Sequence, residues 1–301
     1  MTSFENQAAL QIEAKARPFK VGPGPVPNPS EDEVVIKVAY VAINPVDHIV
    51  QATPIFEYPY PYVLGTDVAG TVAQLGSNVT RFKLGQRVIG HCDGLLTKKP
   101  TNNAFQAYST CREVLMAEVP DSLPLANAAV LPLGFSTAAS GLYINLKLPL
   151  PSLDPKPTGK KILIWGGSSS VGSSTIQLAV ASGLEVLTTA SPANHEYAKC
   201  NDIFAHIGGR GSLPLVLPPQ GTFAENVVPE YVNGLAPGMT HPEIGDGTWR
   251  KFLGQALAAG KFQAKPDPKV ITGGLEKIQE GVDLLKKGVS ATKIVVEISK
   301  E

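Results

Sequence analysis

The sequence lacks an excess of charge and has little cysteine. Its 301 residues include 26 Lys and Arg and 26 Asp and Glu, so the formal net charge is zero. Nonspecific nucleic-acid binding needs a basic surface that releases counterions, which argues against a nucleic-acid partner. Only Cys92, Cys111 and Cys200 are present, too few and too scattered for a disulfide framework. A reducing compartment is therefore expected.

Long apolar runs are also absent. No uninterrupted run approaches the roughly 18 residues that a membrane-spanning helix needs. Residues 1–20 do not combine a basic region with an apolar one, as a signal peptide would. We expect a cytoplasmic protein with no membrane association.

What the chain has is material for packed cores, since hydrophobic residues make up 43% of it. Its length fits two domains. Alternating Val- and Ile-rich runs separated by glycines predict a β-rich unit before residue 150. Pro149–Gly159 contains prolines that break helices and strands, which predicts a linker. The expected strands before it are 33–43, 67–75 and 87–91, and residues 125–146 are helical in character.

After the linker, the pattern changes to that of a parallel α/β domain. Residues 161–165 predict a strand, 171–182 a helix and 185–189 a second strand, which together form a β–α–β unit. Helices are predicted at 249–259 and 274–287. The last expected strand is 293–298.

The turn Gly166–Gly172, with the sequence GGSSSVG, joins the first of these strands to the helix. A dinucleotide pyrophosphate needs a tight turn, close backbone approach and a helix N-terminus, all of which small residues permit. The glycine spacing is not the usual G-x-G-x-x-G, so an ordinary strand–helix turn remains the alternative.

The second strand is followed by residues 190–194, and no acidic residue occurs before Glu196. Sites that prefer NAD usually place an acid here to bind the ribose 2′-hydroxyl. Small polar groups leave room for a 2′-phosphate, and Lys199 could add charge. The pattern favours NADPH, although Ser191 or Asn194 could simply cap a helix.

Together, five motifs in order resemble the medium-chain dehydrogenase/reductase superfamily, in its zinc-free branch. The closest likeness is to fungal trans-acting enoyl reductases, also described as zinc-binding dehydrogenase-like. This resemblance implies an α/β fold. A GroES-like domain would span residues 1–125, with 265–301 returning to it, and a Rossmann-type doubly wound domain would span 126–264. The motifs are Asn44–Asp47 (NPVD), Gly65–Gly70 (GTDVAG), Gly85–Val88 (GQRV), Ala104–Tyr108 (AFQAY) and Leu131–Ala139 (LPLGFSTAA).

The resemblance also implies roles for individual residues. One group would hold the cofactor and a second would line the substrate channel. The cofactor group comprises Val46, Asp47, His48, Thr137, Ser168, Ser169, Ser170, Val171, Ser191, Pro192, Ala193, Asn194, Val289 and Ser290. The substrate group comprises Ala138, Ala139, Ser140, Gly141, Leu142 and Tyr143.

We predict no metal. Zinc-dependent relatives have Cys where this chain has Asn44, and a His-Glu pair where it has Thr66 and Asp67. A catalytic zinc needs three protein ligands. His48, His91 and Cys92 are interpreted as polar loop residues.

Without zinc, the expected chemistry is hydride transfer from NADPH to an activated C=C bond of an enoyl thioester or enone. The substrate would be a small molecule or carrier-bound, with a polyketide synthase as partner. A quinone reductase and a cofactor-binding pseudoenzyme are the alternatives. No catalytic acid is assigned: Tyr60, Tyr62 and Tyr143 are candidates by type only, and Asp67 is expected to cap or bridge backbone. Monomer and homodimer are both open.

The sequence differs from the family pattern near residue 200, where it is shorter than expected. Residues 195–200 run directly into 201–211, which resemble material that lies much further along in relatives. About two βα units, on the order of 50 to 60 residues, are missing by this reading. We therefore predict an incomplete sheet with weakened or lost cofactor binding, and a late strand at 213–217.

Overall fold

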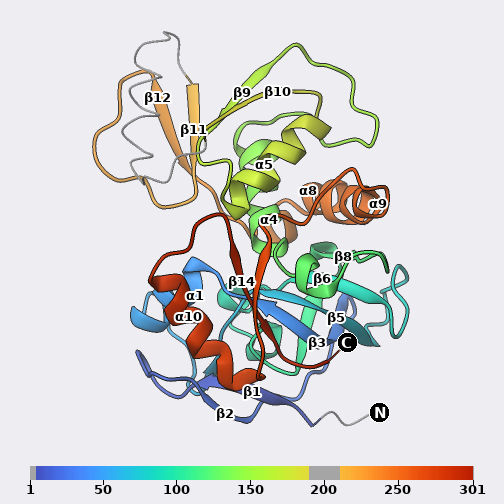
Figure 1. Ribbon diagram of the computed structural model, residues 1–301, viewed down its shortest axis with the longest axis vertical. Helices are drawn as coiled ribbons and strands as arrows, with labels where there is room; N and C mark the ends of the chain where they lie inside the picture. Colours follow the sequence, from blue (N-terminus) through green and yellow to red (C-terminus); the bar gives the residue numbers. More distant parts are fainter. Residues whose placement is uncertain (1–4, 190–210, 301) are drawn as a thin grey trace.

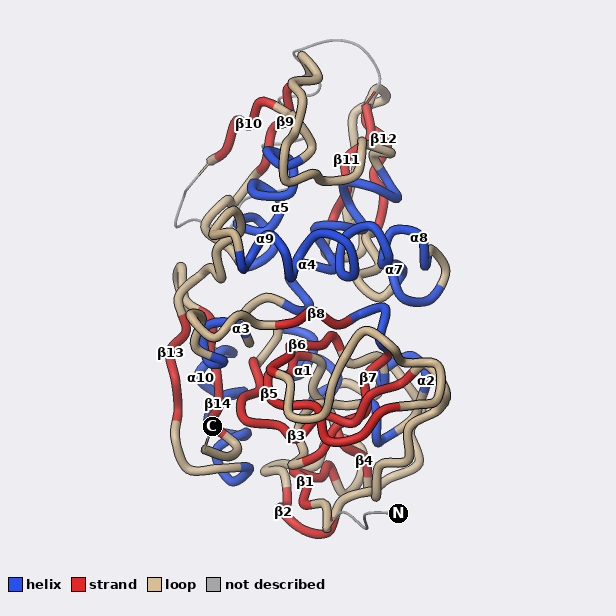
Figure 2. The backbone as a smooth tube through the Cα atoms, turned by 90° about the vertical axis from the view of Figure 1, so that its right-hand side faces the viewer, coloured by secondary structure: helices blue, strands red, loops and turns tan. Residues whose placement is uncertain are grey.

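The computed structural model describes residues 5–189 and 211–300 (Figure 1). Strands gather at both ends of the long axis, and Figure 2 shows helices α4, α7, α8 and α9 in a layer between them. We call the lower part, with β1–β8, β13 and β14, the β-rich unit. The upper part, with β9–β12 and α5, is the paired-strand unit.

The β-rich unit is built on a seven-stranded sheet in the order β13-β14-β3-β5-β6-β8, with β7 also paired to β3. β3, Glu33–Ala42, reads EVVIKVAYVA and exposes only Lys37 fully, so its near-continuous apolar run suits a strand covered on both faces. The strands predicted at 67–75 and 87–91 are confirmed as β5, Asp67–Leu75, and β6, Arg87–His91. The remaining strands of this sheet are β7 Tyr108–Arg112, β8 Met116–Glu118, β13 Pro268–Ile271 and β14 Lys293–Glu297.

A small sheet and short helices complete this unit. The small sheet has the order β2-β1-β4, from Lys20–Pro23, Gln7–Gln11 and Tyr62–Val63. Helix α10, Ile278–Lys286, packs against α1, Pro45–Ala52, as Figure 1 shows. The shorter helices are α2 Gly94–Thr97, η1 Pro100–Asn102, η2 Glu113–Leu115 and η5 Leu275–Lys277.

The helical layer joins the two units through a packed core. The indole N–H of Trp249 donates to Ser136 Oγ at 3.0 Å, and its ring meets Phe135 edge-on at 5.1 Å. The stretch Leu125–Asn145 is long and apolar enough to cross a membrane by length and composition, yet 78% of it is buried inside the fold. It is therefore a core segment of a globular fold. Helix α3, Leu125–Ala128, packs against strands of the β-rich sheet. The layer contains α4 Pro132–Ala139, η3 Ser140–Asn145, α7 Ala236–Met239, α8 Pro242–Gly245, η4 Asp246–Leu253 and α9 Gly254–Ala258.

The predicted β–α–β unit is confirmed in the paired-strand unit. β9, Lys161–Ile164, and β10, Glu185–Thr188, are parallel neighbours joined by α5, Ser170–Ala181. A second parallel pair follows, with β11, Gly211–Leu215, beside β12, Val227–Tyr231. The late strand expected at 213–217 thus begins two residues earlier.

The two pairs are not hydrogen-bonded to each other in the described part of the chain. In a doubly wound sheet, the first strand lies between the second and the fourth. Here β9 has β10 on one edge and no described strand on the other. β10, β11 and the connection between them span residues 185–215, which is about the length of one βαβ unit and leaves no room for a further strand and helix between them. Among the strands that the structure describes, the sheet is therefore interrupted, as the sequence predicts.

Candidate functional site

The turn after β9 is too tight for side chains at two of its glycines. A Cβ atom on Gly167 would lie 2.3 Å from Thr188 Oγ1, and one on Gly172 would lie 2.3 Å from the carbonyl oxygen of Gly166. Gly166 itself has φ of +73°, a conformation that side chains disfavour. The turn therefore packs closely against the end of β10 and the start of the following helix, and both positions require glycine.

Helix α5 begins at this turn, with Ser169 as its N-cap. Ser169 Oγ accepts from the N–H of Gly172 at 2.9 Å. The first N–H groups of a helix have no partner within it and carry partial positive charge, which attracts phosphate. Ser168 and Ser169 are exposed, and Ser170 and Val171 are half-buried, so all four are accessible. These residues fit the pyrophosphate of a dinucleotide.

Of the residues expected near the nicotinamide on α1, one is buried and two are partly exposed. The carboxylate of Asp47 is buried and accepts the backbone N–H of Asn44 at 2.7 Å in the capping box of α1. This burial raises the pKa of Asp47 to about 8. Val46 and His48 are partly exposed on the first turn of the helix. Burial, followed by the charge of Lys286, lowers the pKa of His48.

The middle of the layer places the expected substrate residues in the core. Thr137 is 7% exposed, and the six residues from Ala138 to Tyr143 are all buried. Tyr143 Oη lies 3.0 Å from Ser182 Oγ, against α5. The helix that these residues form packs between two units, so their small and apolar side chains fill space. Their lining of a channel stays a prediction.

The remaining expected residues lie apart from this core. Val289 is half-buried and Ser290 exposed in the turn before β14. The segment Ser191–Asn194, with Pro192 and Ala193, lies outside the described residues.

Asp67 bridges backbone, as the sequence predicts. Its Oδ1 accepts the N–H of Leu133 at 3.0 Å in the first turn of α4. Sequence reasoning missed its second partner, Lys293, whose ammonium lies 3.5 Å from Asp67 Oδ2 and donates to Asn44 Oδ1. Lys293 is the first residue of the predicted final strand, and a lysine where a strand enters a core was the available signal.

The other polar candidates, Tyr62, His91 and Cys92, are buried in the core. Tyr62 donates to the carbonyl of Gly94 at 2.8 Å. His91 is buried, and this burial lowers its pKa to about 4. Cys92 is buried too, and the neighbouring thiol of Cys111 together with burial raises its pKa. Within residues 5–189 and 211–300, no group of three or more His, Cys, Asp or Glu could hold a metal ion.

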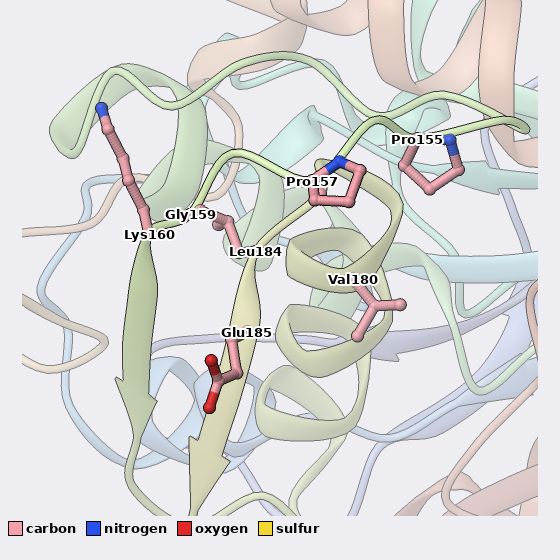
Figure 3. A pocket seen from close by; sticks show the side chains of 8 residues that line it. Pro155, Pro157, Gly159, Lys160, Val180, Leu184 and Glu185 are labelled. Atoms are coloured by element: carbon pink, nitrogen blue, oxygen red, sulfur yellow. The ribbon is translucent and has the colours of Figure 1, made fainter.

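A surface hollow of about 350 Å³ lies elsewhere, at the amino ends of β9 and β10 (Figure 3). Pro155 and Pro157 of the linker form one wall, and Val180 of α5 and Leu184 form another. Because the turn at Gly166 follows the opposite end of β9, the hollow is separate from the residues expected to hold phosphate.

Comparison with known proteins identifies relatives of the whole chain. Residues 30–121 match the family model of the alcohol dehydrogenase GroES-like domain. The chain is 57% identical to a trans-enoyl reductase of Aspergillus japonicus, with 100% of this chain and 99% of that protein covered. It is 30% identical to the enoyl reductase component of lovastatin nonaketide synthase of Aspergillus terreus, with 91% of each covered.

Solved structures share the fold. The enoyl reductase CurK superimposes with a TM-score of 0.72 at 19% identity, over 98% of this chain and 100% of that one. The fold is therefore a GroES-like domain with a Rossmann-like sheet, as predicted.

The alignment with the Aspergillus japonicus relative also bears on chain length. It runs over 341 positions, whereas this chain has 301 residues. At least 40 aligned positions therefore have no counterpart here, which agrees in direction with the expected shortening of 50 to 60 residues.

Proposed function

Because the chain belongs to the medium-chain dehydrogenase/reductase superfamily, whose members are oxidoreductases that use a nicotinamide cofactor, we propose that it is an NADPH-dependent reductase of an activated C=C bond. The observation that carries the proposal is 57% identity to a trans-enoyl reductase over 99% of that protein. The substrate is an enoyl thioester or an enone.

The phosphate-binding role falls to Ser168–Val171, whose turn and helix N-terminus fit a pyrophosphate. The small residues Ser191–Asn194 leave room for a 2′-phosphate, which supports NADPH over NADH. When bound, the cofactor supplies the hydride. The first turn of α1, with Val46 and His48, and Thr137 on α4 orient the reacting groups.

The partner is a carrier-bound chain on a polyketide synthase. One relative is named as the enoyl reductase component of a nonaketide synthase, which supports an enzyme that acts in trans. A cytoplasmic location suits that role. The domain limits, 1–125 with 265–301 and 126–264, belong to the same proposal.

A catalytically impaired cofactor-binding protein is the second candidate. The observation that favours it is the edge of β9 that has no partner strand in residues 5–189 and 211–300, because ligands of doubly wound sheets bind at the carboxyl ends of the central strands. Loss of a strand there removes part of the wall around the cofactor.

The test measures NADPH oxidation by the purified chain with three acceptors: a trans-2-enoyl pantetheine thioester, a simple enone and 1,4-benzoquinone. We expect turnover with the thioester or enone, greater with NADPH than with NADH. Turnover with the quinone alone would replace the proposal with a quinone reductase. Saturable NADPH binding without turnover of any acceptor would establish the second candidate.

A further inference from the structure

Lys293 is a buried lysine outside the residues assigned so far to cofactor or substrate. Only 4% of it is exposed, and lysine is almost never buried to this extent unless it is paired. Its ammonium donates to Asn44 Oδ1 and lies 3.5 Å from Asp67 Oδ2. The C-terminal strand β14 thus contributes a cation between two segments that lie more than 200 residues earlier.

Each partner of Lys293 holds the first turn of a helix that carries proposed site residues. Asn44 is the N-cap of α1, which bears Val46 and His48. The carboxylate of Asp67 accepts the N–H of Leu133 at 3.0 Å, in the first turn of the helix that bears Thr137.

Thr66 closes the network between these two partners. Asn44 Nδ2 donates to Thr66 Oγ1 at 3.0 Å, and this hydroxyl donates to Asp67 Oδ1 at 3.1 Å. The two helix starts are therefore connected through side chains as well as through the ammonium.

Lys293 and Asp67 form an ion pair within this network. Two other titratable groups, His91 and Asp47, also face it. His91, opposite Asp67 on β6, is neutral near pH 7 because burial lowers its pKa to about 4. Asp47, on α1, is mostly protonated because burial raises its pKa to about 8. Removing one member of a buried pair leaves an uncompensated charge, whereas removing both does not.

We propose that Lys293 is a positioning residue of the reductase site, whose ammonium fixes the first turns of α1 and α4 relative to each other. This inference rests on the proposed function. Misplacing a reacting group by about 1 Å can cost on the order of 100-fold in rate. A loose connection between these turns therefore lowers turnover without removing the phosphate-binding turn at α5.

The test compares Lys293→Met, the double variant Asp67→Asn/Lys293→Met and the control Lys269→Met. Lys269 is exposed on β13, next to β14, so its loss should change nothing. The double variant carries no unpaired buried charge and keeps an oxygen for the Leu133 N–H, so it isolates the loss of the connection.

Two readouts are measured on each variant. Amide hydrogen exchange within residues 44–52 and 131–139 should rise about 5-fold or more in both Lys293 variants, with residues 170–181 unchanged. The kcat for enoyl reduction should fall about 10- to 100-fold in both. The dissociation constant of NADPH should stay within about 3-fold of the unmodified chain.

If the double variant regained both the kcat and the melting temperature of the unmodified chain, the proposal would be overturned. The only role of Lys293 would then be to neutralise the charge of Asp67. If the unmodified chain does not reduce enoyl substrates, the proposed function fails and the exchange measurement alone decides. Unchanged exchange in both segments would then refute the positioning role by itself.

Discussion

The β-rich unit and the paired-strand unit differ in how their strands are covered. In the β-rich unit, β3 has paired neighbours on both sides and β5 pairs with β3 and β6. In the paired-strand unit, β9 and β11 each have one strand partner in the described chain. Leu163 on β9 and Leu187 on β10 are 41% and 52% exposed, although such sheets normally bury both faces.

The proposed cofactor site draws on both units, so its parts differ in the strands that support them. The turn proposed to hold phosphate lies between β9 and α5, and β9 is hydrogen-bonded to β10 beside it. Residues of α1 and α4 depend on the β-rich unit and the helical layer. These supports all lie within the described residues, in which β9 has one edge without a partner strand, and such an edge can pair with another chain.

The largest change in stability and cofactor affinity is expected when the paired-strand unit is given a continuous sheet. Replacing residues 149–264 with the corresponding segment of the Aspergillus japonicus relative should restore a continuous sheet. Burying a leucine such as Leu163 or Leu187 fully contributes about 1.5 to 3 kcal/mol. We expect a higher melting temperature and at least about 10-fold tighter NADPH binding, measured by calorimetry and fluorescence titration. Equal values for both proteins would mean that the interruption costs nothing.

The next largest effect contrasts one core side chain from each unit. Phe105 is fully buried and contacts Phe19 edge-on at 6.0 Å, so Phe105→Ala should lower the free energy of unfolding by about 3 to 5 kcal/mol. Leu187→Ala in the half-exposed strand should cost less than about 1 kcal/mol. Urea unfolding of both variants measures the difference. A similar cost at both positions would refute the contrast in coverage.

The pH dependence of stability should come from the β-rich unit. The pKa of Asp47 is raised by burial to about 8, so its contribution is complete below about pH 4 and is lost as the pH rises through 8. The pKa of His91 is lowered by burial to about 4. Its contribution to stability is therefore present above about pH 6.5 and is lost as the pH falls. Of these two contributions in the described part of the chain, the loss from Asp47 is the one that remains between pH 6.5 and 8.

We therefore expect the free energy of unfolding to fall by about 1 kcal/mol per pH unit between pH 6.5 and 7.5. Asp47→Asn, which keeps an oxygen for the Asn44 N–H, should abolish this slope. Urea unfolding at three pH values measures it. An equal slope in the variant would assign the titration to another group.

The smallest effect is expected at the exposed ion pair that links β9 to β10. Lys161 Nζ lies 3.1 Å from Glu185 Oε1, and both side chains are more than 60% exposed. Exposed pairs contribute about 0 to 1 kcal/mol. Lys161→Ala should change the melting temperature by no more than about 2 °C. A larger loss would show that this pair, rather than backbone pairing, holds the two strands together.

Local patterns in the sequence were sufficient to predict much of the fold. Alternation of Val and Ile gave β5 and β6 with their observed limits, and the GGSSSVG turn was placed correctly between β9 and α5. Of the strand pair β11–β12, only β11 was predicted. The segment of β12, VVPEY, was missed because it contains a proline and no clear alternation.

The site was harder to predict because its residues act through distant partners. The loop with Val46, Asp47 and His48 is expected near the nicotinamide, and this stays a prediction. The pattern NPVD could not reveal that the carboxylate of Asp47 closes a capping box. The role of Lys293 depends on Asn44, 249 positions earlier, and no local periodicity reports such a contact. Burial of Ala138–Tyr143 likewise follows from packing between two units.

The most direct test of the account is a fluorescence titration of the chain with NADPH and NADH, alongside Gly172→Ala and Gly22→Ala. A Cβ at position 172 would strike the Gly166 carbonyl, whereas one at position 22 would meet open space. The account predicts saturable binding that is tighter for NADPH, lost in Gly172→Ala and kept in Gly22→Ala. No saturable binding by the unmodified chain, or equal binding by both variants, would contradict the claim that this turn is a working cofactor site.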